Sequence, residues 1–448
     1  MQHAKYIWLI VIISFIIRLM LGLIPSGNLD ERLTRPDSIG YIRSAQILTE
    51  SFCYREGKES MIPQTRYPCG YPLFLAVFFK MHNSLLLPVI FTCLLSALIC
   101  IPIYRAGLLF GNPFAGCVGA ILYALNITSI SSAPLILSDT IFAFLVAWQF
   151  LFFIKFYKNE HFRDLLIAVA FNGLSVFFRT TGFLWILPCF VFLVFFKRWT
   201  FRKRLAGIVL SALLFMLIVV PWMARNSAVG AGFRIEPNIG DTLYYHNAAA
   251  LMSVVSGVSA EELRQEWRTQ SENEFRDNSN NYLNESEKVE YKLKKAKEII
   301  AQHPLQYIRL HIQPMILVPD APTFLELIGM TQTGRGTLDI FRREGFFAAV
   351  NHYFNNKIWL LPALFPFLII VAGTYIACGV QLIRWLIEKQ LGILWIFFSM
   401  AVYFLVLPGP IVMPRYQLPA LPMICFTAGL GISWIYNLVQ TKPYNGVS

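Results

Sequence analysis

Apolar residues occur along the chain in long blocks that are separated by short polar stretches. Several of these blocks approach the ~20 residues that an α-helix needs to cross a lipid bilayer. The pattern therefore predicts an all-α polytopic membrane protein with about ten transmembrane helices. The predicted spans are residues 6–24, 85–105, 113–130, 134–156, 164–179, 182–196, 205–223, 358–384, 390–407 and 417–438.

The spacing of the spans divides the chain into three regions. Residues 1–223 form an N-terminal transmembrane region, with a first outer loop at residues 25–84, and residues 358–448 form a C-terminal one. Residues 224–357 between them are predicted to form a mostly helical segment on the outer face. Each of its two polar helices has a serine at the N-cap and acids in the first turn. These helices, interpreted as a solvated cap, are SAEELRQEWRTQSENEF at 259–275 and SEKVEYKLKKAKEIIAQ at 286–302, which stops at His303-Pro304.

Lysine and arginine set the orientation. The loops KFYKNEHFR (155–163) and KRWTFRKR (197–204) are basic, and they lie on the same side as Lys5, Arg105 and Arg384 if the chain crosses the membrane ten times. Loops enriched in Lys and Arg face the cytoplasm. Both termini are therefore expected to be cytoplasmic, and the outer segment extracytoplasmic.

Composition agrees with a membrane protein. Hydrophobic residues make up 56% of the 448 residues and charged residues only 14%, whereas soluble domains are about 25% charged. The excess of 38 basic over 26 acidic residues lies mainly in short loops, which argues against a nucleic-acid partner. The chain contains no Walker A loop, no glycine-rich dinucleotide turn and no HExxH motif, so a nucleotide or metalloprotease mechanism has no support.

Two of the eight cysteines, Cys53 and Cys69, share a polar loop, whereas the others lie in apolar segments. If that loop is extracytoplasmic, the two can form a disulfide. Two free thiols are an equally good interpretation.

Two aspartates stand out against the apolar pattern. Asp37 lies in RPDSIGYIRSAQIL (35–48), where Tyr41, Ala45 and Leu48 form an apolar stripe that predicts an amphipathic helix along the membrane surface. Asp139, in LILSDTIFAFL, lies a few residues inside an apolar block, where an ionisable side chain is costly and indicates function. For each residue the alternative is a helix cap: Asp37 as an N-cap, and Ser138 with Asp139 capping a helix that starts slightly later.

Four arginines accompany these acids on the outer side. Arg179 follows the span 164–179 at a break in the helical pattern, and a break is tolerated where the backbone faces a cavity. Arg66 lies in RYPCGYPLFLA, Arg225 in PWMARN and Arg415 in MPRYQLPALP. Each can bind phosphate through its guanidinium group or anchor a helix end at the lipid headgroups.

The motifs PDSIGY, RYPCGYPLFLA, LSDTIF, FFRTTG, PWMARN and PRYQLPALP occur in this order. The series resembles the polytopic glycosyltransferases of clan C, which include protein O-mannosyltransferases and the transferase that adds aminoarabinose to lipid A. The resemblance spans nearly the whole chain and is weakest across residues 250–355. Many members have Asp-Glu where this chain has Asp37-Ser38, so the second acid is missing.

The resemblance implies transfer of a sugar from a polyprenyl-phosphate carrier to a glycan, lipid or protein acceptor, at the outer face of a bacterial inner (plasma) membrane. Asp37 and Asp139 match the family's two acids. The implied substrate contacts are at Tyr41, Tyr71 and Arg225.

The residues fit this chemistry. Phosphate leaves as a stable anion, so positive charge near it promotes the reaction; the candidates for this role are Arg66, Arg179 and Arg415, with Tyr416 beside them. Asp37 is the candidate base for an acceptor hydroxyl. Asp139 is expected to orient the acceptor or to share a divalent metal with Asp37, although the sequence contains no evident metal site. Attack opposite the phosphate predicts inversion at the anomeric carbon.

Two other functions remain open. A transporter or flippase usually places charges near the bilayer midplane in two related halves, which this sequence does not show. A polymerase or ligase of lipid-linked glycans also uses outer-face arginines, but it does not need the Asp37 motif.

Overall fold

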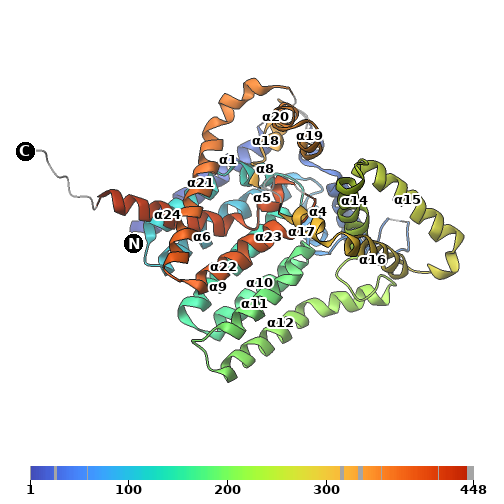
Figure 1. Cartoon of the computed structure of the whole chain (residues 1–448), viewed down its shortest axis with the longest axis horizontal. Coiled ribbons are helices and arrows are strands. Elements are labelled where there is room, and N and C mark those ends of the chain that lie inside the picture. The colour runs from blue at the N-terminus through green and yellow to red at the C-terminus, as the bar shows by residue number, and fades with distance from the viewer. Residues whose placement is uncertain are drawn as a thin grey trace, which may run out of the picture.

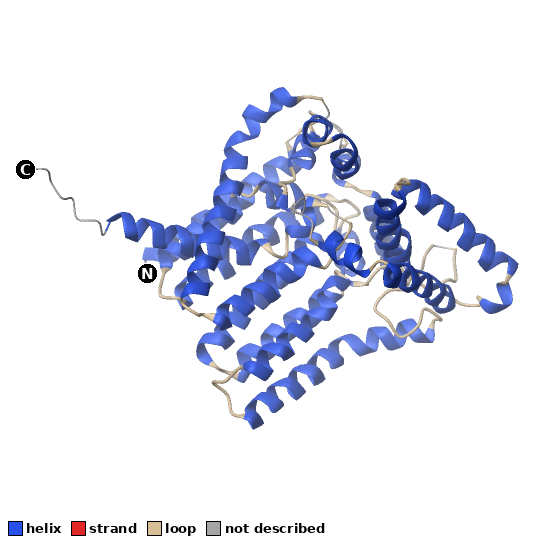
Figure 2. Cartoon of the chain, viewed as in Figure 1, coloured by secondary structure: helices blue, strands red, loops and turns tan. Residues whose placement is uncertain are grey.

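The apolar blocks form one bundle of packed helices (Figures 1 and 2). The computed structural model describes residues 2–24, 28–57, 59–312, 317–330, 337–354, 356–411 and 413–440. Across these residues the only β-structure is an isolated bridge between Arg55 and Pro63. The predicted all-α class is confirmed.

Six helical stretches of the described chain are long and apolar enough to cross a membrane. They lie in α1 (Gln2–Leu23), α5 with α6 (Leu86–Leu98 and Cys100–Leu109), α9 (Asp139–Asn159), α12 (Phe201–Ala228), α21 (Leu361–Ile387) and α24 (Leu421–Gln440). The other predicted spans coincide with shorter helices. These are α7 with α8 (Pro113–Ala124 and Ile127–Ser132), α10 (Phe162–Val176), η1 with α11 (Thr180–Trp185 and Ile186–Phe195), and α22, η6 and α23 (Leu391–Phe397, Phe398–Val402 and Tyr403–Val406).

Helix α9 lies at the centre of the bundle and α12 at its edge. Within the most apolar part of each helix, 72% of the residues of α9 are buried but only 22% of those of α12. Helices α7 and α24 pack so closely that a Cβ atom at Gly429 would collide with the carbonyl oxygen of Ala115. Small residues at such contacts let helix backbones pack tightly in membranes.

Arg18 of α1 is fully buried and ties four helices together. Its guanidinium donates to the carbonyls of Tyr123 and Ala124 at distances of 3.3 and 3.1 Å. These are the last two residues of α7, whose carbonyls have no partner within the helix. The guanidinium also donates to the hydroxyls of Ser96 and Ser129. Its charge therefore lies at the negative end of the α7 dipole.

The first part of the outer segment projects from one end of the bundle (right in Figure 1), whereas the start of α1 and the end of α24 lie at the opposite end. Its first part contains the π-helix η2 (Thr242–Ala248), α14 (Ala249–Ser256), α15 (Ala260–Asp277) and α16 (Glu285–Gln302). It continues through α17 (Pro304–His311), α18 (Ala321–Leu327), α19 (Thr337–Glu344) and α20 (Phe346–Tyr353). Parts of the predicted segment 224–357, residues 313–316, 331–336 and 355, lie outside the described residues.

Two sequence-based boundaries are wrong. The cap of α15 is Ser259, as predicted, but the cap of α16 is Asn284 and not Ser286, because the Asn284 side chain accepts from the amide of Glu287. The span predicted at 134–156 begins only at Asp139. The residues before it form turns, in which the amide of Ile136 donates to the carbonyl of Leu33.

Cys53 and Cys69 are both free thiols in the structure. The disulfide interpretation of this loop is therefore not the one that the fold adopts.

Candidate functional site

Helix α3 (Pro36–Ser51) places Asp37 in its first turn. The N-cap is Arg35, so the alternative in which Asp37 is an N-cap is wrong. The Asp37 carboxylate is half exposed, and its Oδ2 lies 3.6 Å from Nη2 of Arg415. Asp37 is therefore available to a molecule at the surface while an arginine fixes its orientation.

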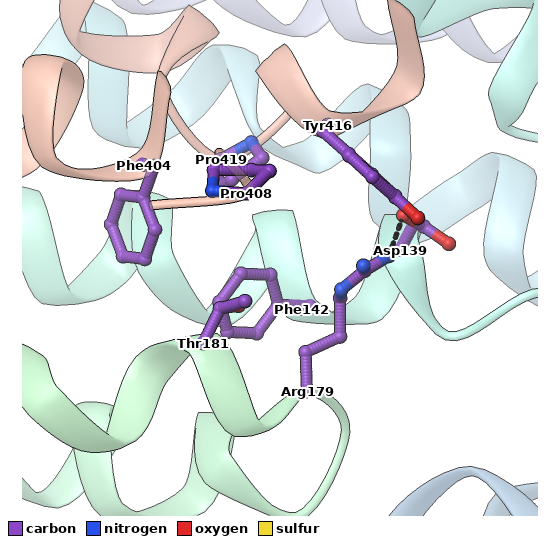
Figure 3. A pocket seen from close by; sticks show the side chains of 8 residues that line it. All are labelled: Asp139, Phe142, Arg179, Thr181, Phe404, Pro408, Tyr416 and Pro419. Carbon is purple, nitrogen blue, oxygen red and sulfur yellow. Dashed lines mark hydrogen bonds and ion pairs between the residues drawn. The ribbon is translucent and has the colours of Figure 1, made fainter. Parts of the chain in front are cut away.

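Asp139 is the first residue of α9 and is 5% exposed. Its carboxylate pairs with the guanidinium of Arg179 (Figure 3). Helix α9 begins later than predicted, as the capping alternative expected, but Ser138 makes no side-chain capping bond. The buried carboxylate of Asp139 therefore forms an ion pair with Arg179. The break predicted between the two short spans places Arg179 here, between the end of α10 and the start of η1.

Tyr416 connects the two ion pairs. The guanidinium carbon of Arg179 lies 4.7 Å from the centre of the Tyr416 ring, and that of Arg415 lies 5.7 Å from it. Nε of Arg415 is buried and has no hydrogen-bond partner in the described part of the chain. A buried donor without a partner is unfavourable, so a rotation of the Arg415 side chain that brings this nitrogen to a ligand oxygen would be favourable.

A small pocket opens between these groups (Figure 3). Its polar side is made by Asp139, Arg179 and Tyr416, and its apolar side by rings from α9, α23 and the segment before α24. The complete lining is Asp139, Phe142, Arg179, Thr181, Phe404, Pro408, Tyr416 and Pro419. Its empty space, which includes open solvent, is about 260 Å³. The guanidinium of Arg179 in its lining is a group that binds phosphate.

Both arginines stay positively charged. Burial lowers the pKa of Arg179, but the carboxylate of Asp139 and the phenol of Tyr416 outweigh burial and raise it. The pKa of Arg415 is also raised: burial lowers it, but the charges of Asp139 and Tyr416 raise it by more. Arg179 and Asp139 therefore bring an ion pair into the pocket lining, and Arg415 with Asp37 forms a second ion pair on the Tyr416 ring beside it.

Three tyrosine rings pack together beside Asp37. The Tyr41 ring centre lies 4.9 Å from that of Tyr67 and 5.0 Å from that of Tyr71. Burial raises the pKa of Tyr41, and a hydrogen bond with Ser138 opposes the rise. A Cβ atom at Gly40 would lie 2.5 Å from the Tyr67 ring, so α3 can approach this ring only with glycine there. Tyr41 borders the site, whereas Tyr71 is fully buried below it.

Two predicted binding residues lie away from the pocket. Arg66 is exposed, with its guanidinium over the Tyr67 ring. Arg225 donates to the backbone carbonyls of Gln64 and Tyr54 at 2.8 and 3.3 Å. Arg225 therefore fastens the first outer loop to the end of α12.

Sequence analysis missed Glu236, which follows α12 in the outer segment. It is partly buried, and its Oε1 accepts a hydrogen bond of 2.8 Å from the hydroxyl of Thr180, the residue after Arg179. An acid directly before a proline at the start of an outer segment was the available signal. Its position beside Arg179 depends on a tertiary contact that no local pattern contains.

The comparisons with known proteins agree on one fold. Residues 66–224 match the model of the dolichyl-phosphate-mannose-protein mannosyltransferase family. The structure aligns with that of the oligosaccharyltransferase AglB from Archaeoglobus fulgidus, in complex with an inhibitory peptide and a dolichol-phosphate, with a TM-score of 0.54 and 12% identity over 99% of this chain and 53% of AglB. The chain has a clan C glycosyltransferase fold.

Further matches belong to the same group. The A. fulgidus oligosaccharyltransferase tethered to an acceptor peptide aligns with a TM-score of 0.55 and 13% identity, over 98% of this chain and 50% of that one. ArnT from Cupriavidus metallidurans, bound to undecaprenyl phosphate, aligns with a TM-score of 0.49 and 13% identity, over 97% and 62%. No curated protein matches the chain in sequence. The chain spans about half the length of the oligosaccharyltransferase.

Ser38, which occupies the position of the missing second acid, is an anchor of the clan C fold in this chain. It is fully buried, its hydroxyl donates to the carbonyl of Ile136 at 2.6 Å, and it accepts from the amide of Arg35 at 2.8 Å. The bond to Ile136 joins α3 to the turn before Asp139. A glutamate here could not donate to that carbonyl when charged.

We expect Ser38→Glu to lower the free energy of unfolding by about 2 kcal/mol or more, because it buries a charge beside a carbonyl oxygen. Ser38→Ala is expected to cost about 1–3 kcal/mol, because the Ile136 carbonyl loses its partner. Thermal unfolding in detergent would measure both. Ser51→Ala, at the exposed end of the same helix, is the control; equal stability of all variants would contradict the anchoring role.

The residues do not fit the divalent metal considered from the sequence. Asp37 and Asp139 each pair with an arginine. The described residues contain no group of three His, Cys, Asp or Glu side chains placed to hold a metal ion.

Proposed function

We propose that this protein is a glycosyltransferase that moves a sugar from a polyprenyl-phosphate carrier to an acceptor hydroxyl at the extracytoplasmic face of the inner membrane. The observation that carries the proposal is that Arg179 and Arg415 both contact the ring of Tyr416, while the buried Nε of Arg415 has no hydrogen-bond partner among the described residues. The dolichol-phosphate in the AglB complex and the family of the matching model support the same class of donor.

The arginines form the phosphate side of the site. The donor phosphate would bind Arg415, whose Nε would gain a hydrogen-bond partner that the described residues do not provide. Arg179, held in position by its ion pair with Asp139, would contact the same phosphate. Negative charge grows on the phosphate oxygen as the anomeric bond breaks, and fixed cations stabilise that charge. Exposed Arg66, one residue from Tyr67 at the rim, would meet the donor on its way in.

Asp37 forms the acceptor side. Its half-exposed carboxylate would accept a hydrogen bond from the acceptor hydroxyl and hold that hydroxyl in line with the anomeric carbon. Tyr41 borders this side, and Tyr71 supports Tyr41 from below. Attack from this side, opposite the departing phosphate, inverts the anomeric carbon.

The arrangement argues against a transporter. The charges gather where α3, α9 and η1 begin. Transporters instead place them near the middle of the membrane at broken helices of two related halves.

The test is a transfer assay on purified protein with a panel of radiolabelled polyprenyl-phosphate sugars, read as release of polyprenyl phosphate or as label in a membrane extract. Wild type should turn over at least one donor. Asp37→Asn should lower kcat by about 10²-fold, since loss of the carboxylate that positions the acceptor hydroxyl can cost about that factor, while the donor still binds.

Absence of both binding and turnover with every donor would overturn the proposal and leave transport as the function to examine. Full activity of Asp37→Asn would retain the enzyme but remove Asp37 from the mechanism, as expected for a polymerase or ligase of lipid-linked glycans.

A further inference from the structure

Glu236 is a third carboxylate at the site, and its position is fixed by the protein. The residue before it, Ile235, is buried, and its carbonyl accepts from Nε1 of Trp222 at 3.0 Å and from Nδ2 of Asn226 at 2.8 Å. The residue after it is Pro237, whose ring restricts the backbone. The end of α12 thus holds this short segment of the outer face in one conformation.

The Glu236 carboxylate lies beside the pocket and not in its lining. Its hydrogen bond to Thr180 places it beside a residue that is flanked by two pocket-lining residues, Arg179 and Thr181. The charges of both Glu236 and Asp37 act on the phenol of Tyr67, the ring that packs on Tyr41. Glu236 and Asp37 therefore border the same space from opposite elements.

The charged state of Glu236 is poorly supported by its surroundings. No lysine, arginine or histidine among the described residues forms an ion pair with it within 4.0 Å, unlike Asp37 and Asp139. Burial raises the pKa of Glu236 to about 7; the hydrogen bond from Thr180 and the charge of Arg179 oppose the rise, and the charge of Asp37 adds to it. A carboxylate in this environment gains from taking up a proton.

We propose that Glu236 receives the proton that the acceptor hydroxyl loses during transfer, while Asp37 holds that hydroxyl in place. This inference rests on the proposed transferase function and assigns the base to the outer segment. Two carboxylates in different environments then have different roles.

Transfer of the sugar forms one bond, breaks one bond and moves one proton. The acceptor oxygen forms a bond to the anomeric carbon, and the bond from that carbon to the phosphate oxygen breaks. The electron pair of that bond leaves on polyprenyl phosphate between Arg179 and Arg415. The proton of the acceptor hydroxyl moves to the carboxylate of Glu236, which then releases it to water.

The first measurement is an infrared pH titration of the purified protein, which follows the carbonyl band of protonated carboxylic acids and needs no turnover. A band that titrates near pH 7 is expected in wild type and in Glu272→Gln, a control at an exposed position of α15. It should disappear in Glu236→Gln. In Thr180→Val its midpoint should move to higher pH. The hydrogen bond from Thr180 stabilises the charged carboxylate in wild type, so its loss raises the pKa of Glu236.

The second measurement is the pH dependence of transfer. The base must be ionised, so kcat should fall as the pH drops below about 7, which gives the pH profile an acidic limb. This limb should move to higher pH in Thr180→Val but not in Thr180→Ser. Glu236→Gln should lower kcat by about 10²-fold at pH 8 and lose this limb. A merely structural role would lower activity without moving the limb.

The outcomes separate the two proposals. A carboxyl band unaffected by Glu236→Gln, or a limb that ignores Thr180→Val, overturns the role of Glu236 and leaves the transferase intact. If wild type transfers no sugar from any donor, the transferase function fails and the proton step fails with it, whatever Glu236 does in the infrared titration.

Discussion

Replacing Arg179 with methionine is expected to abolish transfer and to destabilise the protein at the same time. Its guanidinium pairs with the buried carboxylate of Asp139 and contacts the ring of Tyr416. Loss of one partner of a buried pair typically costs about 3–5 kcal/mol, because the other charge is left unpaired. Loss of a cation that stabilises developing charge typically lowers kcat by about 10²–10³-fold.

The double variant Arg179→Met with Asp139→Leu separates these two effects. Removing both charges leaves no unpaired ion, and apolar residues of similar size can replace a buried pair at little cost in stability. The double variant should therefore melt close to wild type and still fail to transfer sugar. Stability from thermal unfolding and kcat from the donor assay are the measurements. Recovered activity in the double variant would show that Arg179 serves only to neutralise Asp139.

Replacing Arg18 with methionine is expected to cost about 1–3 kcal/mol of stability, since the buried carbonyl of Ala124 at the end of α7 would lose the guanidinium that donates to it. The hydroxyl of Ser96 would lose the guanidinium as well, whereas the carbonyl of Tyr123 would keep its bonds from the amide of Asn126 and the hydroxyl of Ser129. A lower yield of folded protein should accompany the loss.

Arg105→Met provides the matched control, because Arg105 lies at an exposed position of α6. Both variants lose one positive charge, but only Arg18→Met should lower the unfolding temperature in detergent. Equal melting of the two variants would mean that neighbouring groups satisfy the α7 carbonyls without Arg18.

Much of the fold could be predicted from the sequence, because apolar length alone decides which segments can cross a bilayer. The boundaries that failed depend on contacts between distant segments. The turn at residues 134–138 exists because Ile136 bonds to the backbone of Leu33, and an apolar count cannot show that. At α16, both Asn284 and Ser286 are suitable caps, and the structure uses the earlier one.

The candidate site was predictable as a set of residues but not as a set of pairs. Asp37 and Asp139 stood out because acids are rare next to apolar blocks, and the arginines because they share a face. Which arginine serves which acid follows only from packing: Arg179 pairs with Asp139 and Arg415 with Asp37. Glu236 stayed hidden because a glutamate in a polar outer segment is unremarkable until Thr180 is seen beside it.

The first loop is joined to late parts of the chain. Arg32 donates to the carbonyl of Leu327, 295 residues further on, and Arg415, the partner of Asp37, follows later still. At about 5–20 residues per second, a ribosome needs on the order of tens of seconds to make the intervening chain. During that time Asp37 waits without its arginine. On the proposed mechanism, a product that stops before Arg415 would lack one of the two arginines for the donor phosphate, so sugar transfer would require synthesis of the chain at least as far as Arg415.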